Sequence, residues 1–219
     1  MTLTTFLIIS QVQTCISLVG FILFLRIKNP GRAIRYTGIL LIISVMGQLM
    51  PFALREFKIA SPNYATSVHN MIEFVLLNLI YYYSIGQRKY KAVFITITGV
   101  FLIFSLINLV VIQKSAINSN ALILSSLLVI GYTLFYFSWL LRELPTTHLN
   151  RFPMFWFNSG WIIFSSGNLF LFAFTSYLVN VLNNNLLYYW SMFNFLAIIK
   201  TGMIVYGIWM ELQNTKSRS

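Results

Sequence analysis

Two ionisable side chains, Glu73 and Lys200, lie deep inside long apolar stretches of the sequence. A charge at the centre of a membrane helix costs about 2.5–3.5 kcal/mol on insertion scales, so such residues face a bundle interior and pair there. At the helical rise per residue, the two positions differ in depth by about 8 Å, which two long side chains can span. We therefore predict a Glu73–Lys200 pair, which is either a ligand, proton or ion site or a structural pair that fixes helix register.

Three further polar residues, His69, Asn168 and Asn194, complete the candidate site. His69 precedes Glu73 by four residues and shares its helix face. It is a hydrogen-bonded helper of Glu73, an outward-facing pH-sensitive group or a metal ligand; a metal would need further ligands, and no other His, Asp or Cys lies at that depth. Amides in a membrane need partners, so Asn168 and Asn194 either pack between helices or line a cavity.

Small residues accompany Asn168 in the sixth apolar stretch. Gly160 and Gly167 are two helical turns apart and form a smooth stripe on which a neighbouring helix can pack closely. Other amides within the apolar stretches favour a partly hydrated interior. They are Gln11, Gln13, Gln48, Asn78 and Asn108.

Catalytic signals are absent from the sequence. There is no HExxH motif, no phosphate-binding loop and no Asp, which excludes an aspartyl protease. The single Cys15 excludes an internal disulfide and a cysteine-built metal site. We therefore expect neither an enzyme nor a resident cofactor or metal.

The composition excludes an ordinary soluble domain. Of 219 residues, 58% are apolar and 9% are charged, whereas soluble domains carry about 25% charged residues. The apolar stretches are nearly continuous, without the alternation of a membrane β-barrel. We predict an all-α polytopic membrane protein with one seven-helix transmembrane domain over residues 1–219. The predicted helices are 5–25, 36–54, 65–85, 92–112, 120–141, 153–179 and 187–210.

The basic residues predict the orientation. Eleven of them fall in loops on one side of the predicted membrane and three on the other, so the N-terminus is expected outside and the C-terminus in the cytoplasm. The partner expected for this basic surface is the lipid bilayer and not nucleic acid. Aromatic residues mark the two interfaces. The outer set is Tyr64, Tyr177, Tyr188, Tyr189 and Trp190, and the inner set is Tyr81, Tyr82, Tyr83, Tyr90, Trp139, Trp156 and Trp209.

Three segments carry a resemblance to a known family. They are HNMIEFVLLNLIYYYSI (69–85), RFPMFWFNSGWIIFSSGNLFLFAFTSYLV (151–179) and MFNFLAIIKTGM (192–203). Over its whole length the chain resembles a family of small bacterial seven-helix membrane proteins associated with sensor histidine kinases. This resemblance implies a bacterial inner-membrane location, a sensory or signal-relay role, and a histidine kinase or other cytoplasmic signalling partner. A homo-oligomer is also compatible with it.

A looser resemblance links the chain to opsins. Seven helices, an outside N-terminus, Lys200 on the last helix and Glu73 on the third match the opsin plan, in which the lysine would hold retinal and the acid would be its counter-ion. Microbial opsins have an Asp one turn before the lysine, where this chain has Leu196. Three hypotheses therefore stand: a sensory or relay subunit with a polar intramembrane pocket, a small-solute or proton-coupled transporter or channel, and a retinal protein.

Overall fold

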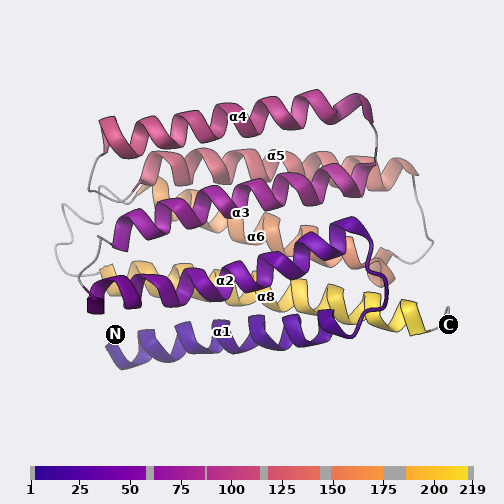
Figure 1. Cartoon of the computed structure of the whole chain (residues 1–219), viewed down its shortest axis with the longest axis horizontal. Coiled ribbons are helices and arrows are strands. Elements are labelled where there is room, and N and C mark those ends of the chain that lie inside the picture. Colours follow the sequence, from indigo (N-terminus) through magenta and orange to yellow (C-terminus); the bar gives the residue numbers. More distant parts are fainter. Residues whose placement is uncertain are drawn as a thin grey trace. The chain divides into compact units, whose positions relative to one another are not determined.

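The computed structural model describes residues 3–57, 62–86, 88–113, 118–143, 149–174 and 186–216, and every regular element in these segments is a helix. The α-helices (Figure 1) are α1 (Leu3–Leu25), α2 (Arg32–Phe57), α3 (Pro62–Ile85), α4 (Lys91–Ile107), α5 (Ser119–Glu143), α6 (Pro153–Ala173) and α8 (Leu186–Lys216). The short helices are η1 (Arg88–Tyr90), η2 (Asn108–Ile112) and η3 (Leu149–Arg151). The all-α prediction is confirmed for these segments.

Five of the described helices are long and apolar enough to cross a membrane. The qualifying segments are Leu7–Leu25, Arg32–Met50, Lys91–Ile112, Ser119–Glu143 and Trp190–Lys216. Helices α3 and α6 do not qualify, although they have 24 and 21 residues. Since their length suffices, the polar residues inside them lower their hydropathy. The chain is therefore a helical protein with membrane-embedded character, and α3 and α6 carry polar residues within their apolar segments.

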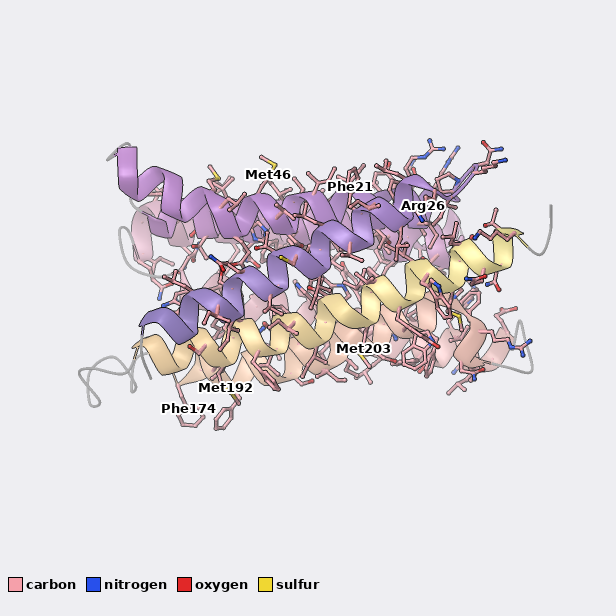
Figure 2. All side chains as sticks on the ribbon, turned by 90° about the horizontal axis from the view of Figure 1, so that it is seen from below. Phe21, Arg26, Met46, Phe174, Met192 and Met203 are labelled. Atoms are coloured by element: carbon pink, nitrogen blue, oxygen red, sulfur yellow. The ribbon has the colours of Figure 1, made fainter. Side chains whose placement is uncertain are left out.

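The chain divides into two compact units. Unit 1 combines Met1–Pro30 with Ser126–Ser219. In it α8 contacts both α1 and α6, and α1 runs in the same direction as α8 while α6 runs opposite (Figure 1). The buried face of α8 repeats every three or four residues, as a helix requires. This face is formed by Ala197, Lys200, Thr201, Ile204, Ile208 and Leu212. Met192 and Phe174, by contrast, project from the surface of unit 1 (Figure 2).

Unit 2 consists of Gly31–Ser125, and α3 is its central helix because it contacts both α2 and α4. The rings of Phe74 on α3 and Phe101 on α4 pack with their centroids 4.1 Å apart. The opposite face of α4 is aliphatic and exposed, with Val100 and Ile103 each at 61% exposure. In a membrane helix such a face suits contact with lipid chains.

Asn78 and Asn108 are buried in unit 2, and the side chain of each connects neighbouring segments. Asn78 Nδ2 donates to the carbonyl oxygen of Phe94 at 3.0 Å and ties α3 to α4. Asn108 donates to Gln113 Oε1 at 2.7 Å and to the side-chain oxygen of Asn118, so it links the π-helical turn η2 to the residues just before α5. Side-chain hydrogen bonds to a backbone carbonyl and to neighbouring amides therefore hold both residues in place.

Three details of the sequence prediction are wrong. Gln11 is exposed on α1 and not interior. Tyr81 is fully buried in unit 2 and is no interfacial marker, because it belongs to the packed face of α3. Helix α6 ends at Ala173, six residues before the predicted end at Val179, which lies outside the described residues. The apolar run continues beyond the helix, and hydropathy does not mark where a backbone leaves the helical conformation.

Candidate functional site

A close antiparallel contact between α6 and α8 provides the framework of the candidate site. A Cβ added to Gly160 would lie 3.0 Å from the carbonyl oxygen of Lys200, and one added to Gly167 would lie 2.6 Å from Cδ1 of Leu196. Both glycines therefore face α8 at van der Waals distance, as small residues at membrane-helix contacts do. The predicted glycine stripe and its use for close packing are confirmed.

The ammonium group of Lys200 lies over two aromatic rings of α6. Its Nζ atom is 4.1 Å from the ring centroid of Trp161 and 4.0 Å from that of Phe164, and the residue is only 4% exposed. Ring faces carry negative potential, so they attract a desolvated cation. Trp161 directly follows Gly160, and Phe164 lies one helical turn after Gly160. The close packing of α6 on α8 at Gly160 therefore places Lys200 against both rings.

Asn168, one turn after Phe164 on α6, is a completely buried amide. Neither its Oδ1 nor its Nδ2 has a hydrogen-bond partner within the part of the chain that the structure describes. The same holds for Nε1 of Trp161. An unsatisfied buried polar group costs about 1–3 kcal/mol, so an amide here lowers stability unless another molecule satisfies it. Asn168 thus offers two donors and an acceptor one helical turn from Phe164, one of the two rings that contact Lys200.

Phe193 and Asn194 of α8 lie at the level of Asn168. The ring of Phe193 is 5.5 Å from that of Phe164 and 6.1 Å from that of Phe172, centroid to centroid. These two α6 residues flank Asn168 by one turn on either side, so Phe193 spans its level. Asn194 is the next residue along α8 and is 4% exposed. The structure therefore places both predicted amides at one level of the α6–α8 contact.

His69 on α3 is half-buried and packs against α2 within unit 2. Its Nε2 lies 3.2 Å from the carbonyl oxygen of Ile43. A carbonyl only accepts, so Nε2 carries the hydrogen and donates it. A Cβ added to Gly47 would lie 2.2 Å from Cδ2 and Nε2 of the ring, so the imidazole occupies space that only a glycine leaves free. This hydrogen bond goes to the backbone of α2, so the three interpretations of His69, including the helper of Glu73, stay predictions.

Glu73 lies one turn after His69 and is half-buried on α3. It belongs to unit 2, whereas Lys200 belongs to unit 1. The Glu73–Lys200 pair therefore stays a prediction, as does a joint role of Glu73 and His69. Among the described residues no three His, Cys, Asp or Glu side chains cluster in a way that would hold a metal ion.

The sequence analysis did not predict the aromatic partners of Lys200, and it did not predict that Gly47 leaves room for the His69 ring. A signal for Phe164 was present, because its four-residue spacing from Gly160 puts both residues on one helix face. No comparable signal pointed to Gly47, which is far from His69 in sequence and meets it only through the contact of α2 with α3.

Comparisons of the chain with models of protein families, with curated proteins and with solved structures found no match. The side chains of α6 and α8 are therefore the basis for proposing a function.

Proposed function

We propose that this chain is a sensory or signal-relay membrane protein that binds a small ligand at the α6–α8 contact of unit 1. The observation that carries this proposal is Asn168, a fully buried amide whose two polar atoms have no partner among the described residues. A ligand with a carboxylate or carbonyl group would accept hydrogen bonds from the amide, and it would meet the positive field of Lys200.

The proposed topology has seven spans, with the N-terminus outside and the C-terminus in the cytoplasm of a bacterial inner membrane. The lengths of α3 and α6 support the two additional spans, since 21 residues of helix extend about 31 Å. The buried polar groups of α3 and α6 support a position inside a bundle, where neighbouring helices satisfy them.

Relay requires that the ligand prefers one arrangement of α6 and α8 over another. The glycine contacts make these helices suited to that role, because a tightly packed interface changes between discrete arrangements and does not deform continuously. The basic loops proposed to face the cytoplasm would then present the change to a partner such as a histidine kinase.

Ligand binding is tested with the purified full chain in detergent. Small monocarboxylates are titrated while intrinsic tryptophan fluorescence is recorded, since the Trp161 ring contacts Lys200. The wild type is expected to respond saturably and Asn168→Leu is expected to lose the response. The control is Ser166→Leu, two residues away on the exposed side of α6, which should respond like the wild type. A response that survives Asn168→Leu, or no saturable response to any carboxylate, contradicts the proposed site.

Two experiments distinguish the relay role from the alternatives. One is crosslinking to a cytoplasmic partner, and the other is a measurement of proton or solute flux in liposomes. Crosslinking in native membranes is expected to recover a cytoplasmic signalling protein with the full chain. The transporter or channel alternative is favoured by Glu73, a half-buried acid on a polar helix. It predicts proton or solute flux in liposomes that Glu73→Gln abolishes, and such flux without a captured partner would overturn the relay proposal. An absorption band after retinal is supplied would support the opsin-like alternative instead.

A further inference from the structure

One end of unit 2 carries exposed basic residues beside tyrosines. We call it the basic–tyrosine cluster, and it consists of Arg32, Arg35, Tyr36, Tyr83, Lys89 and Lys91. These residues come from the start of α2, the end of α3, η1 and the start of α4. Since α3 contacts both α2 and α4, and the three helices alternate in direction (Figure 1), these ends lie together.

Aromatic rings hold two of the cations in place. The Cζ atom of Arg32 lies 5.2 Å from the ring centroid of Tyr83, and the ring of Tyr36, one turn after Arg32, stacks on Tyr83 at 5.5 Å with an interplanar angle of 11°. Nζ of Lys89 lies 4.9 Å from the ring centroid of Tyr90. Arg32 and Lys89 nevertheless remain exposed. The rings therefore limit the motion of the cations while leaving their hydrogen-bond donors accessible.

The sequence places no acidic residue at this end of unit 2. The first turns of α2, η1 and α4 contain none. The two acids between residues 31 and 125 are Glu56, near the far end of α2, and Glu73, which lies about 18 Å along α3 from Ile85. No acidic residue of unit 2 therefore neutralises the cluster.

The cluster lies at a hydrocarbon boundary. Two of the helices that qualify as membrane spans begin at Arg32 and at Lys91. On α4 the surface changes within one turn from the exposed charge of Lys91 to Ile95, an aliphatic residue that is 60% exposed. Charges that directly adjoin lipid-facing aliphatic residues lie at the depth of the phosphate groups of a bilayer.

We propose that the basic–tyrosine cluster binds the headgroup phosphate of an anionic phospholipid. Arg32, positioned by Tyr83, donates to the phosphate oxygens, and Arg35, Lys89 and Lys91 supply the surrounding positive field. This site is in unit 2 and does not depend on the ligand site of unit 1.

The test measures which lipids stay bound to the full chain. The protein is purified in detergent with equal amounts of phosphatidylcholine and phosphatidylglycerol, and the retained lipids are quantified by mass spectrometry. The wild type is expected to enrich phosphatidylglycerol, and Arg32→Gln should lower that enrichment about five-fold. Arg32→Lys, which keeps the charge but loses the guanidinium that lies over Tyr83, should lower it about two-fold. The control Arg142→Gln removes an exposed charge at the end of α5, outside the cluster, and should change nothing.

Each remaining outcome overturns the proposal. Equal retention of the two lipids by the wild type would show that the cluster selects no headgroup. An equal loss in Arg142→Gln and Arg32→Gln would show that total charge and not the cluster determines retention. Displacement of phosphatidylglycerol by an equimolar amount of inorganic phosphate would identify free phosphate as the ligand. Unchanged enrichment in both Arg32 variants would exclude a role for the guanidinium, and both variants should fold because Arg32 is exposed.

Discussion

The substitution Gly160→Ala will destabilise unit 1, because the added methyl group would crowd the contact between α6 and α8. The new Cβ would lie 3.0 Å from the carbonyl oxygen of Lys200, 3.3 Å from its Cα and 3.1 Å from Cβ of Met203, the α8 residue labelled in Figure 2. Two of these atoms are backbone, so relief requires the two helices to separate by a few tenths of an ångström. Overpacking of this kind costs about 1–3 kcal/mol. A separation would also draw Lys200 away from the rings of Trp161 and Phe164.

The other glycines of the contact give a predicted order of effects. At Gly207 the added atom would lie 2.7 Å from the carbonyl oxygen of Pro153, again backbone and closer, so Gly207→Ala should cost at least as much as Gly160→Ala. At Gly167 the nearest atom, 2.6 Å away, is Cδ1 of Leu196 at the end of a flexible side chain. Leu196 can change rotamer, so Gly167→Ala should cost less than about 1.5 kcal/mol.

Gly202 is the matched control because it lies on α8 itself and has no atom within 4 Å of an added Cβ. Alanine there gains helix propensity and should be neutral or stabilise the protein by up to about 1 kcal/mol. The assay is thermal unfolding in detergent, where about 2 kcal/mol corresponds to a shift in Tm of about 4–8 °C for a chain of this size. Equal Tm values for Gly160→Ala and Gly202→Ala would refute the close α6–α8 contact.

Three further predictions concern polar side chains, and thermal unfolding in detergent measures all of them. Gly47→Ala should displace the imidazole of His69 and lower the unfolding free energy by about 1–3 kcal/mol, while in a His69→Ala background it should be nearly neutral; equal effects in both backgrounds would contradict the contact. Asn168→Leu should leave stability unchanged or raise it, whereas Asn158→Leu, which loses a 3.0 Å hydrogen bond from Nδ2 to the carbonyl of Thr133, should lower it by about 1–3 kcal/mol. Asn108→Ala should also lower the unfolding free energy by about 1–3 kcal/mol, because the side chains of Gln113 and Asn118 lose their hydrogen bonds to Asn108. An unchanged Tm would show that this hydrogen-bond network adds no stability.

Hydropathy predicted the helices well but not their ends. The predicted end of the third helix at Ile85 agrees with α3, where Gly86 follows with a φ of 67° and stops the helix. The predicted start of the second helix at Tyr36 is four residues late, because α2 begins at Arg32. The two arginines in this first turn are helical but polar. Hydropathy therefore locates the boundary of the hydrocarbon and not the end of the backbone helix.

The sequence predicted that Lys200 lies within an apolar segment, but it did not predict which side chains contact it. The position of Lys200 within an apolar stretch showed that its charge needs compensation, and a carboxylate was the partner that the sequence suggested. The structure shows that the faces of Trp161 and Phe164 contribute as well. Aromatic residues count as apolar in a hydropathy profile, so a profile does not reveal them as partners of a cation. Only the packing of α6 on α8, set by the glycines, brings them to Lys200.

The polar residues of α3 and α6 divide into those that connect helices and one that does not. Asn78 on α3 and Asn158 on α6 each donate to a backbone carbonyl of a neighbouring helix. Such amides help to lower the hydropathy of these two helices below that of the five candidate spans. Asn168 has the same burial and the same chemistry, yet within the described segments it has no such carbonyl. A buried amide that stabilises no contact is a cost that packing does not explain. Binding of a ligand beside Lys200 would explain it, so Asn168 is the residue at which the function of this membrane protein is most directly tested.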